Sequence, residues 1–301
     1  MTEASNQHGT LAGILWMVAA GLLFVAVTVA VRYLGSDMPA VQAAFIRYLL
    51  GLLMLIPVLL RIRWRSISRQ SHGLYFFRGI AHGLAVMLWF FSMARIPIAD
   101  VTAIGYTTPI FTAVGAIVFF REEMHLRRLS AIAAGFIGTL IILRPGLQVI
   151  EIGALAQLVA APCFAISFLL AKKLTQKQDS WEILAMLSIY CTLVLLPGAL
   201  MVWRTPTLVE VAWLLLVAVF ATAGHYALTR AFANAPLTVT QPFGFLQLVW
   251  AILFGYLLFD ETPDIWVAVG AAIIVTAVTY ISHREARVRR VKLKTTPSQP
   301  G

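Results

Sequence analysis

Ten long apolar stretches follow one another along the 301-residue chain and constrain its fold more than any other feature. Each is close to the ~20 residues that an α-helix needs to cross the hydrocarbon core of a bilayer. Helices of this length satisfy their own backbone hydrogen bonds in lipid. The stretches cover residues 11–34, 39–60, 73–94, 98–119, 127–143, 152–171, 181–202, 208–230, 236–259 and 264–282.

The composition supports a membrane protein and excludes a water-soluble enzyme. Hydrophobic residues make up 60% of the chain and charged residues only 12%, about half the charged fraction of a soluble domain. The connections between the stretches are short, which leaves no room for a separate domain. We therefore predict an all-α, polytopic membrane protein with ten transmembrane helices.

The basic residues gather on one side of the predicted membrane. The chain has 23 Lys and Arg against 13 Asp and Glu, a net charge of +10. With a cytoplasmic N-terminus, 17 of the 23 fall on the cytoplasmic side, four fall outside, and Arg47 and Arg78 lie within spans. Cytoplasmic loops are enriched in Lys and Arg, so we expect both termini in the cytoplasm. This explanation of the charge needs no nucleic-acid partner.

The second half of the chain repeats the layout of the first. Each half holds five spans, and because five is odd, the second half must enter the membrane from the opposite side. Inverted-topology repeats of this kind build alternating-access transporters. When the second half is aligned with the first so that Pro236 falls on Pro97, Glu261 falls on Glu122. When the separation between the aligned positions is one residue longer, Gly13 matches Gly153, Phe24 matches Phe164 and Arg32-Tyr33-Leu34 matches Lys172-Lys173-Leu174.

These features divide the chain into four parts. Residues 1–10 lack the Lys or Arg of a cleavable signal, so the stretch that starts at Leu11 is expected to be a true first span. The parts are an N-terminal cytoplasmic tail (1–10), a first five-helix repeat (11–144), a second five-helix repeat (150–282) and a basic cytoplasmic tail (283–301). The two cysteines lie in apolar stretches and indicate neither a disulfide framework nor a metal site.

Polar residues within the spans are the first candidates for a transport site, because polar groups are costly in lipid. Tyr75, Arg78, His82 and Trp89 share one helical face, which we expect to line a wet cavity. His82 is the foremost candidate, as a hydrogen-bond partner of the substrate or as a group that titrates near neutral pH. The alternative for these residues is a structural contact between helices, and for Arg47 and Arg78 also snorkelling towards the interface.

Two prolines lie inside spans. Pro109 removes the donor for the carbonyl of Gly105, and Pro242 does the same for Thr238. Freed carbonyls are tolerated where they line a cavity, although a kink for packing is the alternative. For Trp16 and Phe24 we favour packing or lipid contact. The candidate substrate-binding residues are His82, Trp89, Tyr106, Pro109, Gln241, Phe243, Gln247, Trp250, His225 and Arg78.

No Asp or Glu lies in the middle of a span. A carrier of cations, or a proton antiporter built on a carboxylate, would need one there. Buried Arg and His without an acid suit a neutral substrate or one with a carboxylate, and an amino acid fits. Its side chain would lie among Trp89, Tyr106, Phe243 and Trp250. Facilitated diffusion and proton exchange through His82 both remain open.

The sequence resembles the ten-helix EamA-type branch of the drug/metabolite transporter superfamily over residues 11–282. The motifs are Phe45-Ile46-Arg47-Tyr48, Thr108-Pro109-Ile110 with Glu122, and Gly255-Tyr256 with Glu261 and Gly270. Two departures are Leu248, where the repeat would place a proline, and Ala131, where the second half has Gly270. Within the branch the chain is similar to bacterial exporters of aromatic and neutral amino acids. The resemblance implies helices around a central cavity, in the bacterial inner membrane.

We therefore predict a secondary transporter that exports neutral and aromatic amino acids by alternating access. It is expected to be no enzyme, to need no cofactor or metal, and to have its substrate and membrane lipid, but no nucleic acid, as partners. One alternative is a carrier for another organic anion or a phosphorylated sugar, which would need several basic residues around one cavity. Another is a membrane enzyme or a channel, but the sequence lacks the common catalytic motifs and repeated polar rings.

Overall fold

The computed structural model describes thirteen ranges of the chain, and within them every regular element is an α-helix. The prediction of an all-α fold is confirmed. The described residues are 3–62, 69–108, 110–112, 115, 133–134, 137–138, 140–141, 151–234, 243–244, 246–262, 264–273, 275–276 and 279–280.

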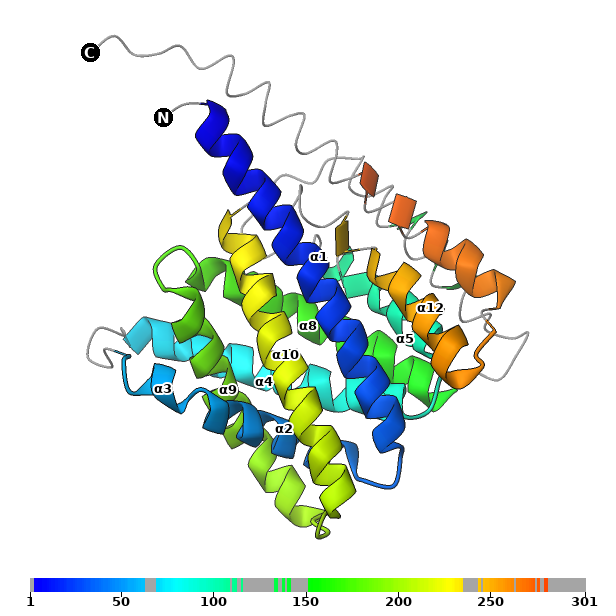
Figure 1. Ribbon diagram of the computed structural model, residues 1–301, viewed down its shortest axis with the longest axis horizontal. Coiled ribbons are helices and arrows are strands. Elements are labelled where there is room, and N and C mark those ends of the chain that lie inside the picture. The colour runs from blue at the N-terminus through cyan, green and yellow to red at the C-terminus, as the bar shows by residue number, and fades with distance from the viewer. Residues whose placement is uncertain are drawn as a thin grey trace.

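The helices follow the apolar stretches closely (Figure 1). Within the described ranges, five are long and apolar enough to cross a membrane, and they begin at Leu11, Ser71, Ile152, Ser180 and Leu208 when polar ends are trimmed. The elements are α1 (Glu3–Leu34), α2 (Ala40–Met54), α3 (Ile56–Leu59), α4 (Arg69–Met93), α5 (Ile98–Gly105), α8 (Ile152–Leu174), α9 (Ser180–Met201), α10 (Leu208–Asn234) and α12 (Leu246–Phe259).

Two predicted spans are interrupted. The stretch 39–60 divides at Leu55, which ends α2 and caps α3. The cause is Pro57 in the first turn of α3, because its nitrogen cannot donate to the preceding turn. The stretch 98–119 is interrupted where α5 ends at Gly105. Most of the stretch 127–143, the matched residue Glu122 and the start of the stretch 236–259 lie outside the described residues.

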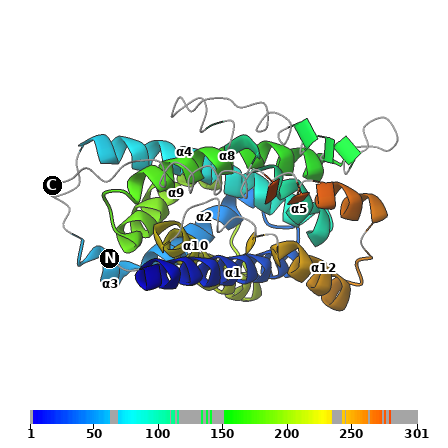
Figure 2. The same ribbon diagram turned by 90° about the horizontal axis from the view of Figure 1, so that it is seen from above.

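The helices pack mainly across the two halves of the chain. α1 lies along α10, α4 lies along α8, and α2 lies along α9. The first two pairs are equivalent under the repeat, because the first and third spans of one half meet the third and first spans of the other. Figure 2 shows α1 on one side of the molecule and α4 and α8 on the other. This exchange of equivalent helices is what two repeats related by a pseudo-two-fold axis produce.

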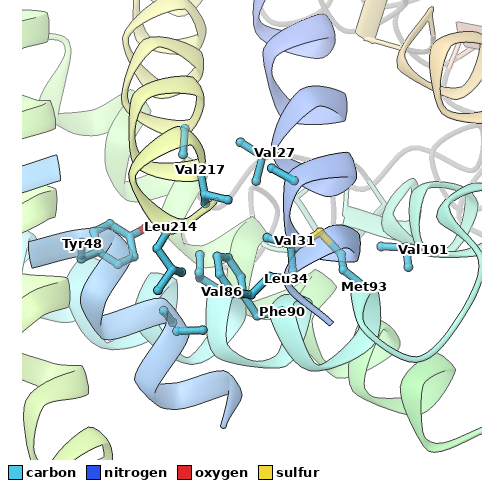
Figure 3. Packing of buried hydrophobic residues seen from close by; sticks show 14 of the residues in the cluster. Val27, Val31, Leu34, Tyr48, Val86, Phe90, Met93, Val101, Leu214 and Val217 are labelled. Carbon is cyan, nitrogen blue, oxygen red and sulfur yellow. The ribbon is translucent and has the colours of Figure 1, made fainter. Parts of the chain in front are cut away.

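The main apolar cluster fills the space between α1, α2, α4, α9 and α10. Figure 3 shows Val27 and Val31 of α1 meeting Phe90 of α4 and Leu214 and Val217 of α10. Lipid tails are as apolar as these side chains, so close packing rather than the hydrophobic effect must stabilise such contacts. The cluster therefore holds the two halves together at the depth where any shared site would lie.

Small residues bring α4 and α9 unusually close together. A Cβ atom at Gly79 of α4 would lie 2.5 Å from the Cβ atom of Tyr190 in α9 and 3.2 Å from its carbonyl carbon. The nearby Cys191 thiol donates to the Gly79 carbonyl over 3.6 Å. Only glycine permits this approach, because the atoms in the way belong partly to the backbone. Small residues have the same role at many membrane helix contacts.

Candidate substrate-binding cavity

A cavity of about 200 Å³ lies between α1, α4, α5, α8, α10 and the start of α12. This is many times the ~10–15 Å³ that one water molecule needs, so a small organic molecule has room. The walls are mostly apolar with a few polar side chains, as in most small-molecule sites. Both halves of the chain contribute to it.

Aromatic rings form the main wall of the cavity. Trp89 of α4 packs edge-on against Phe24 of α1, at 6.3 Å between ring centroids, and against Phe164 of α8, at 6.0 Å. Phe168 stacks on Phe164 one turn further along α8, at 5.9 Å. All four rings line the cavity. Edge-to-face pairs of this kind hold rings in fixed orientations and leave faces free for a flat ligand.

Gln157 of α8 supplies the most distinctive polar group of the wall. Its side chain is only 3% exposed and lines the cavity. Its amide oxygen Oε1 has no hydrogen-bond partner in the described part of the chain. Buried polar atoms are nearly always paired, so an unpaired one at a cavity wall is available to a ligand donor. Three lining hydroxyls, those of Thr28, Thr102 and Thr112, each donate to the carbonyl four residues earlier, as when Thr102 donates to Ile98 over 2.9 Å.

The interruption of α5 lies directly beside Gln157. The N–H of Tyr106 donates to the carbonyls of Thr102 and Ala103, both over 3.2 Å, in a tightened last turn. A Cβ atom on Gly105 would lie 3.1 Å from the Gln157 Nε2 atom. Glycine at this position therefore lets the amide of α8 approach the end of α5. The sequence-based expectation of a broken helix at this depth agrees with the observed end at Gly105.

The cavity wall is built from positions that the repeat makes equivalent. Each half contributes one member of every pair, so the cavity lies at the interface between the two halves. Substrate sites of inverted-repeat transporters lie at this interface. The lining pairs are Met17 with Gln157, Phe24 with Phe164 and Thr28 with Phe168 at the longer offset of the repeat, and Trp89 with Leu228, Gly105 with Gly244 and Thr108 with Gln247 at the shorter one.

Four of the predicted site residues line the cavity, namely Trp89, Tyr106, His225 and Gln247. They come from α4, the end of α5, α10 and α12, which lie far apart in the sequence. The structure therefore brings together residues that the sequence could only propose one by one. Their contact with a substrate stays a prediction.

His82 lies one layer behind the cavity wall. Its side chain is fully buried, and its ring centroid is 4.9 Å from that of His225 and 5.3 Å from that of Phe164. Its Nδ1 atom is 2.9 Å from the Ser167 hydroxyl. Its Nε2 atom has no partner among the described residues. His82 thus supports His225 and Phe164, which themselves line the cavity.

Arg78 is not among the lining residues and meets α9 instead. Its Nη1 atom donates to the Ile183 carbonyl over 3.2 Å, and the side chain is 4% exposed. One turn earlier, the Tyr75 hydroxyl donates to Glu182 over 3.0 Å. The expectation that the whole face of α4 is wet therefore differs from the structure. The cause is that α9 packs over the first turns of this face, so that only Trp89 reaches the cavity.

The remaining predicted residues are divided between packing and undescribed positions. Trp250 packs with Val25, Ile98 and Ala251 rather than in the cavity wall. Phe243 is exposed and is not a lining residue. Pro109 and Gln241 lie outside the described residues.

Sequence reasoning missed several lining residues. The sequence favours packing or lipid contact for Phe24, and Gln157, Phe164 and Phe168 are not among the candidate residues. Two signals were present in the sequence. Phe24 and Phe164 occupy equivalent repeat positions, and Gln157 is a polar amide in an apolar stretch like Gln247.

The family is decided by comparison with known proteins. The sequence model of the EamA-like transporter family matches the chain twice, over residues 11–144 and over residues 151–283. The chain belongs to this family. The expected resemblance is thereby confirmed, and as an EamA protein the chain is a multi-pass membrane transporter.

Similar EamA proteins carry several kinds of small molecule. The chain is 30% identical to a riboflavin transporter of Vibrio cholerae, over 95% of this chain and 98% of the relative. It is 27% identical to an S-adenosylmethionine uptake transporter of Rickettsia bellii, over 93% and 97%. It is 26% identical to the pseudopaline exporter CntI of Pseudomonas aeruginosa, over 90% and 95%. These names support transport of small molecules and give no specific support to amino-acid export.

A solved structure shares the fold. A crystal structure of a protein superposes with a TM-score of 0.60 over 91% of this chain and 97% of the other, at 16% identity. At this identity the likeness concerns the fold alone.

Proposed function

We propose that this EamA protein is a secondary transporter for a small metabolite with a flat aromatic or heteroaromatic group. The observation that carries the proposal is the cavity walled by Phe24, Trp89 and Phe164 at the interface of the two halves. Aromatic faces favour flat ring systems. The unpaired oxygen of Gln157 adds one directional contact for a ring N–H or hydroxyl donor.

The charge of the wall favours a neutral substrate. In the described part of the chain, no Asp or Glu lines the cavity, so a cation would lack a fixed counter-charge. Arg47 and Arg78 do not line it either, and Arg47 lies 3.9 Å over the Tyr48 ring instead. The convergent basic residues that a phosphorylated sugar would need are therefore absent from the described wall. Riboflavin, which is flat, neutral and rich in donors, is the first compound to test, and the names of relatives support that choice.

Export of aromatic amino acids is the second candidate. The end of α5 favours it, because Pro109 cannot supply the donor that the Gly105 carbonyl would have in a continuous helix. In this second proposal the Gly105 carbonyl accepts from the ammonium group of the substrate and His225 binds its carboxylate, and both residues line the cavity. The aromatic wall would then hold the amino-acid side chain.

The proposed orientation has both termini in the cytoplasm, and reporter fusions at each terminus test it.

Counterflow in proteoliposomes tests the proposed function. Vesicles with purified protein are loaded with unlabelled compound and diluted into the same compound in labelled form, without ATP or an imposed ion gradient. We expect transient accumulation of riboflavin. Accumulation of tryptophan or phenylalanine without riboflavin would select the second candidate. If neither class of compound accumulates while the protein remains folded, the proposal is wrong.

A further inference from the structure

Arg32 at the end of α1 and Glu261 after α12 form an ion pair between the two halves. Arg32 Nη2 lies 3.1 Å from Glu261 Oε1. The other carboxylate oxygen, Oε2, accepts the backbone N–H of Ile98, the first residue of α5, over 2.9 Å. Arg32 Nη1 also donates to the carbonyls of Met93 and Ile96, over 3.3 and 3.1 Å. One carboxylate thus joins the ends of α1 and α12 and the start of α5.

The local backbone is shaped to present Glu261. Asp260 adopts a φ of 53°, a left-handed conformation that Asp tolerates better than most residues. The chain then turns back, and the Glu261 N–H donates to the Gly255 carbonyl over 3.1 Å. A Cβ atom on Gly255 would lie only 2.9 Å from Glu261 Oε2. In this structure the turn and the glycine together direct the carboxylate towards the start of α5.

Glu261 also meets a need of α5. Pro97 precedes α5 and gives no side-chain hydrogen bond to its first turn. The first N–H groups of a helix lack partners and carry partial positive charge. The carboxylate of the other half supplies the missing acceptor. The contact is therefore specific in geometry as well as in charge.

This contact lies across one end of the cavity. The lining residues of α1 end at Thr28, one turn before Arg32, and those of α5 begin at Val101, one turn after Ile98. Glu261 is 12% exposed, and a small cavity of about 70 Å³ lies beside it, so the carboxylate has room to move.

The opposite end of the molecule repeats part of this arrangement. Lys172 stands at the repeat position equivalent to Arg32 and donates to the Phe232 carbonyl over 3.1 Å. Phe232 in turn is equivalent to Met93, which accepts from Arg32. In each half, the same basic position therefore bonds the same carbonyl position. These bonds stay within one half, whereas the two bonds of Glu261 cross between the halves.

We propose that the contact between Arg32 and Glu261 is a gate of transport. It closes the cavity at this end in the present structure, and it separates when the cavity opens there. The inference rests on the proposed alternating-access function, in which one end must be closed while the other is open. The bonds within each half hold Arg32 in place, so that the movable part is the carboxylate of the other half.

Thiol labelling tests the gate. Thr28→Cys places a reporter just inside the gate, in a background where Cys163 and Cys191 are replaced by Ala. A membrane-impermeant maleimide is added to intact cells and, separately, to inverted vesicles, which identifies the protected side. Glu261→Gln should accelerate labelling from the Arg32 side several-fold, and Arg32→Lys, which keeps the charge, should not. Gly255→Ala should also accelerate labelling, because it displaces the carboxylate without removing it.

The neighbouring acid provides a matched control. Asp260→Asn removes the same charge one position away, and Asn tolerates the left-handed conformation, so labelling should stay slow. Equal labelling of Glu261→Gln, Asp260→Asn and the parent would overturn the gate.

Counterflow is measured in the same gate variants with Thr28 restored. Unchanged labelling with intact counterflow rejects the gate and keeps the transporter. Accelerated labelling with no counterflow in any variant, the parent included, keeps the gate and rejects the substrate proposal. Size-exclusion profiles in detergent confirm that each variant is folded.

Discussion

Phe24 of α1 and Phe164 of α8 line the same cavity from positions that are equivalent in the two halves of the chain. Trp89 bridges them, packing edge-on against each ring. At the equivalent position in the second half stands Leu228, which also lines the cavity. The wall is therefore symmetric in its two phenylalanines and asymmetric in its largest ring, and this difference gives the first prediction.

Trp89→Ala should weaken substrate binding by about tenfold, because aromatic contacts contribute ~0.5–1.5 kcal/mol beyond the area they bury. Trp89→Phe should retain most of the affinity, since an aromatic face remains. The Michaelis constant for counterflow measures the effect. Leu228→Ala is the control, because it enlarges the same cavity without removing a ring. Equal effects of Trp89→Ala and Leu228→Ala would show that volume rather than stacking matters.

Gln157→Leu should lower transport without lowering stability. The Gln157 Oε1 atom has no partner in the described part of the chain, so its removal breaks no bond there. Replacing an unsatisfied buried polar group by an apolar one is neutral or stabilising. Thermal unfolding in detergent and the counterflow Michaelis constant separate the two effects. A fall in melting temperature with normal transport would contradict a ligand-binding role.

Gly79→Ala should destabilise the protein by about 1–3 kcal/mol, the usual cost of overpacking. The added methyl group would meet the Tyr190 Cβ atom and backbone, so α4 and α9 must separate. Gly73→Ala in the same helix is the matched control, because its Cβ atom would have nothing within 4 Å. Alanine there should be neutral or slightly stabilising, since it favours the helix. Similar melting temperatures for the two variants would refute the close contact.

His82 and His225 should differ in their effect on transport. His225 lines the cavity, whereas His82 is fully buried behind it beside Ser167. We expect His225→Gln to change the Michaelis constant, because the imidazole lines the cavity and faces the substrate there. His82→Gln should reduce the rate at all pH values alike. The Michaelis constant and the initial counterflow rates between pH 5 and 8, where His titrates, test this. A profile altered only by His82→Gln would restore His82 as the titrating group.

Local patterns in the sequence are sufficient to predict the apolar spans and their division into two halves. A bilayer sets one length for every crossing helix, so α8, α9 and α10 start within a residue of the predicted stretches. The repeat is indicated by matched residues such as Phe24 and Phe164, and its inverted order by the odd number of spans in each half. The sequence also indicated the break near Gly105, since a proline removes a backbone donor whatever surrounds it.

Which polar side chains share a cavity depends on the packing of helices that are distant in the sequence. Arg78 and Trp89 lie on one helix and close to one face, yet Arg78 meets α9 and Trp89 meets the cavity. Helical periodicity gives the direction of a side chain but not the neighbour that crosses at that depth. The same holds for Gln157 and Glu261. Gln157 lies beside Gly105 and Glu261 accepts from Ile98, and both of these α5 residues are far from them along the chain. Contacts of that range depend on how the two halves pack, which no local pattern in the sequence records.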